Sequence, residues 1–507
     1  MPIRTLPHLI LLATTSLVAC SAALAEVGKP PNFLILIGDD MSVETVGCYG
    51  VGSSPAKTPQ IDQLCDTGMR FDNFWTQPLC SPTRATMLTG QFGFRNGVGT
   101  PAGGPIPELI VPEKPASAPP ESAREGGRRG RAGGEGPRGP REITPNPNAQ
   151  RPGYTEPENA RPSISIDAYG LPRALAADAS LGYQTAAVGK WHLASNENGL
   201  TDHPANVGFD HYAGGITAAV ESFYAWSKVV DGEITEGDTR YATTATVDDG
   251  LSWLSQRDTD KPWLLWVAFN APHTPQGTPP DSLLSEETAG GIANVDIAEE
   301  RLPFYLAMIE AMDSEIGRML EAIEPEELAN TYVIFIGDNG TPPEGVTAPF
   351  VRGRVKGSVY QGGVNTPFVV TGPGIEGASV SKSLANSVDL YSTILDLAGV
   401  GRDPKLDEVT LDAVSLVPTF KDPATQVRSY AYADVFGPQQ NVIANRRAIR
   451  DDRFKLVLDL QNDTAEFYDL SVDPYEKVDL LQNALNDDAQ ASYDGLTAKL
   501  DALIASK

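Results

Sequence analysis

Short continuous apolar runs, each ending in glycine or in polar residues, recur along the chain. Residues 32–38 and 331–337 are two such runs, and an Asp-Asp pair (39–40) and an Asp-Asn pair (338–339) follow them directly. Runs of this length without polar alternation are typical of strands that are buried on both faces of a parallel sheet. Similar strands are predicted at 184–188, 263–269 and 367–371, and helical periodicity marks 297–323 and 387–397.

Strands that alternate with helices predict an α/β fold, in which helices cover both faces of a large, mostly parallel sheet. Ligands of such sheets bind beyond the carboxyl ends of the strands, where both polar pairs are expected to lie. The tail differs, because it predicts short antiparallel strands at 430–435, 446–450, 454–460 and 466–470 and a helix from about 489. We therefore predict a catalytic domain over 26–425 and a smaller C-terminal α+β domain over 426–507.

Residues 101–162 interrupt this pattern. The segment is rich in Pro, Gly, Arg and Glu and nearly devoid of aromatic residues. Such a composition buries too little apolar area to offset the entropy of ordering, so we predict a disordered surface insertion. An alternative is a basic arm that attracts a polyanionic substrate.

The N-terminal residues predict export. A positive start at Arg4, a short apolar stretch over 9–18 and the small-residue site at 23–25 form a signal peptide that ends at residue 25. The overlapping Leu-Val-Ala-Cys run at 17–20 resembles a lipoprotein box, in which Cys20 is acylated after cleavage. Both alternatives place the protein in the periplasm or outside the cell, with a membrane contact only through a lipid at Cys20.

Charge and cysteine content narrow the classes of function. The 507 residues carry a formal net charge of −27, which argues against a nucleic-acid partner. Four cysteines are too few for a disulfide scaffold. Cys48 and Cys65 can form a disulfide in an oxidising compartment or remain buried thiols.

The densest chemical signal is the run Cys80-Ser-Pro-Thr-Arg84. Pro82 suits the first turn of a helix, and Gly90 suits its end. Cys80 is then at a helix N-terminus, which favours an anion, and Arg84 lies one turn further on the same face. An isolated cysteine in such a place is more often a buried packing residue, so the run alone leaves both interpretations open.

Cys-x-Pro-x-Arg followed by Thr89-Gly90 resembles the signature of type I sulfatases, a family of the alkaline phosphatase superfamily. The resemblance extends over nearly the whole chain apart from the signal and 101–162, and it implies an alkaline-phosphatase-like fold. It also implies that a formylglycine-generating or sulfatase-maturating enzyme oxidises Cys80 to formylglycine. The hydrated aldehyde would then be the nucleophile.

Asp39, Asp40, Asp338 and Asn339 form an oxygen-only set, which suits Ca²⁺ or Mg²⁺ better than zinc. Taken alone, such pairs at strand ends are often helix caps or solvated turns. The family resemblance implies that all four bind one metal ion, which we expect to be Ca²⁺. The formylglycine made from Cys80 would complete the set of ligands.

Three further polar residues follow predicted strands. Lys190 and His192 come after the strand at 184–188, and His273 comes after the strand at 263–269. A histidine in such a place is often structural. The resemblance implies that Lys190 binds the sulfate and that His192 forms a hydrogen bond with the formylglycine hydrate. It also implies that His273 contacts the sulfate and protonates the leaving oxygen.

Lys356 resembles the lysine that bridges the sulfate and the leaving group in this family. The family often continues with Glu-Gly-Gly-x-Arg-x-Pro, whereas this chain has Gln361 and Asn365 at the two charged positions. In the implied mechanism, Arg84, Lys190 and Lys356 neutralise the sulfuryl oxygens, and Asp338 accepts the proton of the nucleophile.

The resulting prediction is a hydrolase of aryl or carbohydrate sulfates. One alternative is a formylglycine-dependent phosphonate or phosphodiester hydrolase of the same superfamily. Two-zinc phosphatases fit less well, because they need several histidine ligands and a Ser or Thr nucleophile. A second alternative is a catalytically silent protein that binds sulfated glycans, against which the intact set of polar residues argues.

Overall fold

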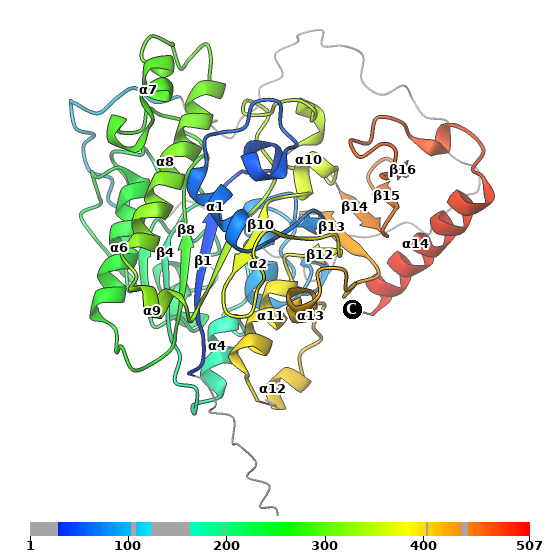
Figure 1. Cartoon of the computed structure of the whole chain (residues 1–507), viewed down its shortest axis with the longest axis horizontal. Helices are drawn as coiled ribbons and strands as arrows, with labels where there is room; N and C mark the ends of the chain where they lie inside the picture. The colour runs from blue at the N-terminus through cyan, green and yellow to red at the C-terminus, as the bar shows by residue number, and fades with distance from the viewer. Residues whose placement is uncertain are drawn as a thin grey trace, which may run out of the picture.

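A ten-stranded mixed sheet forms the centre of the computed structural model, which describes residues 29–102, 108–122, 163–195, 198–401, 404–437 and 445–506 (Figure 1). Five neighbouring strands are parallel: β9 (Thr331–Gly337), β1 (Asn32–Gly38), β8 (Trp263–Ala268), β4 (Gln184–Gly189) and β5 (His211–Gly214). Beyond β9 lie β10 (Phe368–Thr371), β2 (Met69–Phe71) and β11 (Ser379–Ser381), and beyond β5 lie β6 (Val229–Val230) and β7 (Glu233–Ile234).

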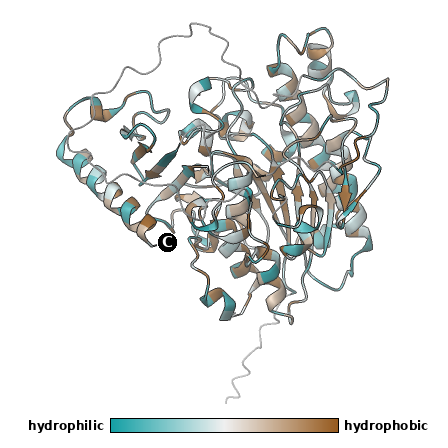
Figure 2. Ribbon diagram, turned by 180° about the vertical axis from the view of Figure 1, so that it is seen from behind, coloured by the Kyte–Doolittle hydropathy of each residue, from teal (hydrophilic) through white to brown (hydrophobic). Residues whose placement is uncertain are grey.

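Helices cover both faces of the sheet because alternate residues of each strand point to opposite sides. Leu34 and Leu36 of β1 pack towards α1 (Pro59–Thr67), α6 (Ala242–Gln256) and α8 (Leu302–Glu321). Phe33, Ile35 and Ile37 pack towards α2 (Cys80–Thr89), α4 (Leu171–Ala177) and α11 (Asp389–Ala398). Figure 2 shows the apolar strands of the main sheet between these layers. Shorter helices are α3 (Gly93–Asn96), α5 (His203–Asn206), α7 (Glu286–Ile292), α9 (Pro325–Leu328), α10 (Gln361–Val364), α12 (Pro404–Asp407) and α13 (Val417–Lys421).

A second, antiparallel sheet lies to one side of the main sheet (Figure 1). Its strands are β13 (Ala431–Val435), β14 (Arg446–Arg450), β15 (Phe454–Asp459) and β16 (Thr464–Asp469). One face packs against α14 (Asp487–Ala505), and the other packs against residues of the main body that include Trp75 and Val359. Trp75 belongs to a short two-stranded pairing of β3 (Phe74–Trp75) with β12 (Ala385–Asn386).

The predicted fold class is confirmed, while element ends move by a few residues. The helix expected from 297 begins at Leu302, where Pro303 occupies its first turn. No helix among the described residues is long and apolar enough to cross a membrane. The export signal lies outside the described residues. Cys48 and Cys65, which the sequence left open, form a disulfide.

The prediction of disorder across 101–162 is wrong for 101–102 and 108–122. Leu109 packs against the core, and Glu121 forms an ion pair of 2.7 Å with Lys114. Glu121 also accepts a hydrogen bond of 2.6 Å from the N–H of Phe223. Composition misled here because specific polar contacts of Glu121, together with the packing of Leu109, hold these residues in place. The remainder, 103–107 and 123–162, lies outside the described residues.

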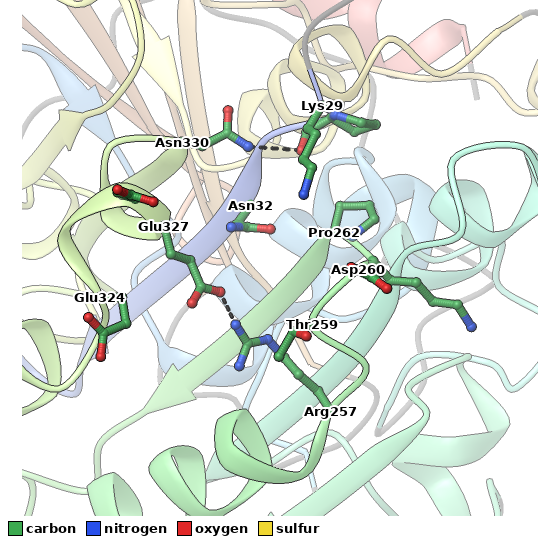
Figure 3. A pocket seen from close by; sticks show the side chains of 12 residues that line it. Lys29, Asn32, Arg257, Thr259, Asp260, Pro262, Glu324, Glu327 and Asn330 are labelled. Atoms are coloured by element: carbon green, nitrogen blue, oxygen red, sulfur yellow. Dashed lines mark hydrogen bonds and ion pairs between the residues drawn. The ribbon is translucent and has the colours of Figure 1, made fainter.

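A polar cavity of about 390 Å³ lies at the amino-terminal edge of the parallel strands (Figure 3). Asn32 at the start of β1 and Pro262 before β8 line it. Its Arg257 already forms an ion pair with Glu327. The cavity is therefore at the sheet edge opposite to the polar pairs that follow β1 and β9.

Candidate active site

The two polar pairs meet at the carboxyl edge of the sheet. Gly38 and Gly337 are paired in the register of β1 and β9, so the residues that follow them are neighbours. Asp338 Oδ1 accepts a hydrogen bond of 3.1 Å from the backbone N–H of Asp40. Asp40 has a φ of 77°, a backbone conformation that non-glycine residues rarely adopt and that is typical of functional sites.

Cys80 is the first residue of α2, as the sequence predicted, and the helix ends at Gly90 with a left-handed backbone. Arg84 is fully buried one turn further along. Its Nε and Nη2 donate to Asp338 Oδ2 at 3.1 and 2.9 Å, and its Nη1 donates to the carbonyl of Lys190 at 2.7 Å. Arg84 therefore fixes a carboxylate of the predicted metal set and the turn after β4 at the same time.

The acidic residues fit a bound cation. Oxygen or sulfur atoms of Asp39, Cys80 and Asp338 lie within 4.8 Å of one another. Asp39 Oδ1 and Asn339 Oδ1 are buried without a hydrogen-bond partner, which is costly unless an ion binds there. Burial, with Asp338 and Asp40 nearby, raises the pKa of Asp39 to about 8 despite the contact with Lys190. These residues thus present buried oxygen acceptors for which the protein itself supplies no hydrogen-bond donor.

Two lysines approach these carboxylates. Lys190 Nζ contacts Asp39 Oδ2, and Lys356 Nζ lies 2.6 Å from Asp40 Oδ2. Burial acts to raise the pKa of Asp40, but Lys356 and His273 lower it to about 2. Asp40 is therefore ionised at neutral pH and forms an ion pair with Lys356 inside the centre.

His192 contacts position 80. Its Nδ1 lies 3.1 Å from Cys80 Sγ, and its Nε2 lies 2.9 Å from the carbonyl oxygen of Ala102. A carbonyl only accepts, so Nε2 carries the proton and Nδ1 is left as an acceptor for a donor at position 80. Burial, with Lys190 and Arg84 nearby, holds the pKa of His192 well below its usual value, which keeps the ring neutral.

His273 lies at the outer side of the same centre. Its Nδ1 donates to the carbonyl of Thr274 at 2.8 Å, and its Nε2 lies 3.9 Å from Asp40 Oδ2. The side chains of His273 and Lys356 are 17% and 18% exposed, whereas those of Arg84 and Lys190 are fully buried. His273 and Lys356 are therefore the parts of this centre that face the solvent.

The structure adds residues that the sequence analysis missed. Ser81 Oγ donates to the carbonyl of His192 at 2.8 Å and accepts from the N–H of Ala102 at 2.7 Å. Trp191 Nε1 donates to His203 Nδ1 at 2.9 Å, which holds the turn between Lys190 and His192. Ser81 stands within the Cys80 motif and was open to notice, whereas Ala102 fell in a segment expected to be disordered.

Comparison with known proteins shows the family to which the chain belongs. The sulfatase family model matches residues 31–115 and 148–400, and the model of the C-terminal part of N-sulphoglucosamine sulphohydrolase matches 355–505. The chain belongs to the sulfatase family. The unmatched stretch, 116–147, falls inside the segment whose composition is unusual.

Relatives within the sulfatase family include two human enzymes. The chain is 27% identical to human N-acetylgalactosamine-6-sulfatase over 417 residues, which is 77% of this chain and 66%, just under two thirds, of the relative. It is also 27% identical to human arylsulfatase A over 437 residues, covering 80% of this chain and 71% of the relative.

Solved sulfatase structures share the fold. The PsFucS1 sulfatase from Pseudoalteromonas sp. superposes with a TM-score of 0.64 at 21% identity, covering 94% of this chain and 90% of that chain. BT4656, solved in complex with its substrate D-glucosamine-2-N,6-O-disulfate, gives a TM-score of 0.65 at 20% identity and covers 94% and 99%. At these identities the likeness shows the fold alone.

Proposed function

We propose that the protein hydrolyses sulfate esters with a formylglycine at position 80. The observation that carries the proposal is the place of Cys80: at the start of α2, 3.1 Å from the acceptor nitrogen of His192 and beside Asp39 and Asp338. The relatives' names support an aryl or carbohydrate sulfate as substrate.

Asp39, Asp40, Asp338, Asn339 and the oxygen of residue 80 would hold one Ca²⁺ in this proposal, because Ca²⁺ prefers carboxylate and amide oxygen ligands. When bound, the ion neutralises charge on the sulfuryl group and on the nucleophile. Arg84 and the N–H of Asp40 already bind both oxygens of Asp338. We therefore propose that Asp338 binds the metal ion and anchors Arg84, and that it does not accept the proton of the nucleophile as the sequence suggested.

A hydrated aldehyde explains why position 80 would be modified. A thiolate that attacked sulfur would remain covalently sulfated, whereas a hydrate has a second hydroxyl. One hydroxyl of the hydrate releases its proton to solvent, its oxygen attacks sulfur as the bond from sulfur to the ester oxygen breaks, and the departing oxygen takes a proton from protonated His273. The second hydroxyl then gives its proton to His192 Nδ1, the carbon–oxygen bond to sulfate breaks, and the aldehyde is restored.

The remaining polar groups bind substrate in this proposal. Lys190 and Lys356 offer ammonium groups to the sulfuryl oxygens. His273, which like Lys356 is partly exposed to solvent, offers Nε2 to the leaving oxygen. The structure shows these side chains close together, and we infer their roles in substrate binding from that proximity.

The decisive experiment measures residue 80 and the reaction together. We expect mass spectrometry of the peptide around Cys80 to find formylglycine, and the same preparation to hydrolyse an aryl sulfate. Cys80→Ala should be folded and inactive. Full activity with only unmodified cysteine would overturn the formylglycine assignment. Faster turnover of phosphonate or phosphate diesters than of any sulfate would favour the alternative hydrolase, and binding of sulfated glycans without turnover would favour the silent binder.

Export to the periplasm or beyond is the second part of the proposal. The signal pattern of residues 1–25 supports it, and the Cys48–Cys65 disulfide suits an oxidising compartment. Labelling with a palmitate analogue separates the two forms of export. Incorporation that Cys20→Ala abolishes indicates a lipid anchor, and release of unlabelled protein indicates plain secretion.

A further inference from the structure

A buried ion pair joins the C-terminal sheet to the segment that carries Lys356. Lys455 on β15 lies 2.5 Å from Glu476, and the two side chains are 0% and 2% exposed. Lys455 Nζ also donates to the carbonyl of Val359 at 2.7 Å and lies 4.6 Å from the centre of the Trp75 ring. One ammonium group from the C-terminal sheet thus makes three contacts at this boundary.

Glu476 and Trp75 complete a closed set of contacts with Gln361, the first residue of α10. Glu476 Oε2 accepts a hydrogen bond of 2.7 Å from the N–H of Gln361. Trp75 Nε1 donates to Gln361 Oε1 at 2.9 Å. We call these five buried residues the seam cluster: Trp75, Val359, Gln361, Lys455 and Glu476.

The seam cluster lies between two parts of the candidate active site. Val359 follows Lys356 by three residues, and Trp75 precedes Cys80 by five. The N–H of Lys356 donates to the carbonyl of Thr341 at 3.1 Å, and the N–H of Gly357 donates to the carbonyl of Pro78 at 2.8 Å. The segment of Lys356 is therefore held on one side by the main body and on the other by the seam cluster.

Stability alone is a poor reason for this arrangement. Removing two charges from water is costly, so replacing both partners of a buried ion pair by neutral residues is often neutral or stabilising. Glu476 also has a φ of 59°, a conformation that is costly for a non-glycine residue. Burial lowers the pKa of Lys455 to about 8, so the ammonium form still dominates at neutral pH. The boundary therefore contains a buried charge pair and a left-handed non-glycine residue, neither of which stability alone explains.

We propose that Lys455 and Glu476 are positioning residues that fix the turn after Lys356, so that its ammonium group lies against Asp40 and the sulfuryl oxygens. This inference rests on the proposed sulfatase function. It gives the C-terminal sheet a part in catalysis, although Lys455 and Glu476 do not belong to the set that touches substrate.

The test compares stability with turnover in three variants. Lys455→Met leaves Glu476 buried and unpaired, so both the melting temperature and kcat should fall. Lys455→Met/Glu476→Gln removes both charges while keeping an acceptor for the Gln361 N–H, so the melting temperature should recover. We expect kcat to stay at least about tenfold below that of the parent, because small displacements of a catalytic group are costly. Recovery of kcat together with stability would overturn the proposal.

A matched control breaks another buried ion pair at the same boundary. Arg428 pairs with Asp389 at 3% and 0% exposure, and its hydrogen bonds, to Asp389 and the carbonyl of Asp412, involve no member of the seam cluster. Arg428→Met should lower the melting temperature and leave the kcat of the folded enzyme unchanged. An equal fall in kcat in this variant would show that any loosening of the boundary has the same effect, which contradicts a specific role for Lys455 and Glu476.

A background variant shows whether the pair acts through Lys356. When Lys455→Met/Glu476→Gln is added to Lys356→Ala, kcat should not fall below that of Lys356→Ala alone. Lys356→Ala and the Lys455→Met/Glu476→Gln variant of the parent should each change KM and kcat in the same proportion. Additive losses would overturn the proposal. If Lys455→Met does not fold, Glu476→Gln alone should lower kcat, and an unchanged kcat would overturn the proposal equally. A mature parent that turns over no sulfate ester would instead refute the proposed function.

Discussion

Loss of His273 should depend on the leaving group of the substrate. The Nδ1 proton of His273 is committed to the carbonyl of Thr274, so only Nε2 can deliver a proton to a departing oxygen. General acids contribute about 10²–10⁴-fold when the leaving group is a poor one, which corresponds to about 3–5 kcal/mol. We therefore expect His273→Ala to lower kcat for a sugar sulfate by this factor and kcat for an activated aryl sulfate only slightly.

The acid role of His273 also predicts the direction in which kcat changes with pH. Burial, with Lys356 and Lys190 nearby, holds the pKa of His273 well below its usual value, so little imidazolium exists at neutral pH. The imidazolium fraction grows as the pH falls towards this lowered pKa. Turnover of a sugar sulfate should thus rise on mild acidification in the parent, turnover of an aryl sulfate should lack this rise, and His273→Ala should lack it for both.

The assay measures kcat for one sugar sulfate and one nitroaryl sulfate across pH, with formylglycine content determined in every preparation. His273→Gln is the matched control, because an amide donates a hydrogen bond to sulfate but supplies no acidic proton. Equal losses on both substrates, or full rescue by glutamine, would refute the acid role and leave His273 as a sulfate-binding residue. Selective loss in Lys356→Ala instead would move the acid role to Lys356.

Five further outcomes test the rest of the centre and the 101–162 segment. Chelation should abolish hydrolysis and lower the melting temperature, Ca²⁺ but not Zn²⁺ should restore both, and full activity without metal would contradict the site. Arg84→Lys loses the two-pronged contact with a buried carboxylate and should cost about 3–6 kcal/mol in urea unfolding, at about 1.5–3 per charged hydrogen bond. His192→Ala should accumulate a sulfated residue 80, seen by mass spectrometry, and turnover without such accumulation would contradict the role of His192 as base. Replacing 123–160 by a short Gly/Ser linker should leave kcat on an aryl sulfate nearly unchanged, whereas Glu121→Ala should cost about 2 kcal/mol of stability through its lost buried contacts.

The sequence by itself determined the features that depend on neighbouring residues. Apolar runs identified β1 and β9, because a strand buried on both faces needs a continuous apolar stretch. The spacing of Cys80, Pro82 and Arg84 placed the cysteine at the start of a helix with the arginine one turn away, since helix geometry relates residues three and four apart. The carboxyl edge of the sheet as the place of the site follows from the parallel topology that these patterns imply.

Only the tertiary structure decided which distant groups meet. Arg84 donates a hydrogen bond to Asp338, which lies 254 positions further along the chain, and no repeating sequence pattern predicts that partner. Ala102, which fixes the tautomer of His192, lies in a segment that composition predicted to be disordered. No sequence pattern singled out Lys455 and Glu476, and only the structure shows that they form a buried ion pair at the boundary of the C-terminal sheet. Local patterns specify elements because their geometry repeats over a few residues, whereas partners across the fold depend on how every element packs.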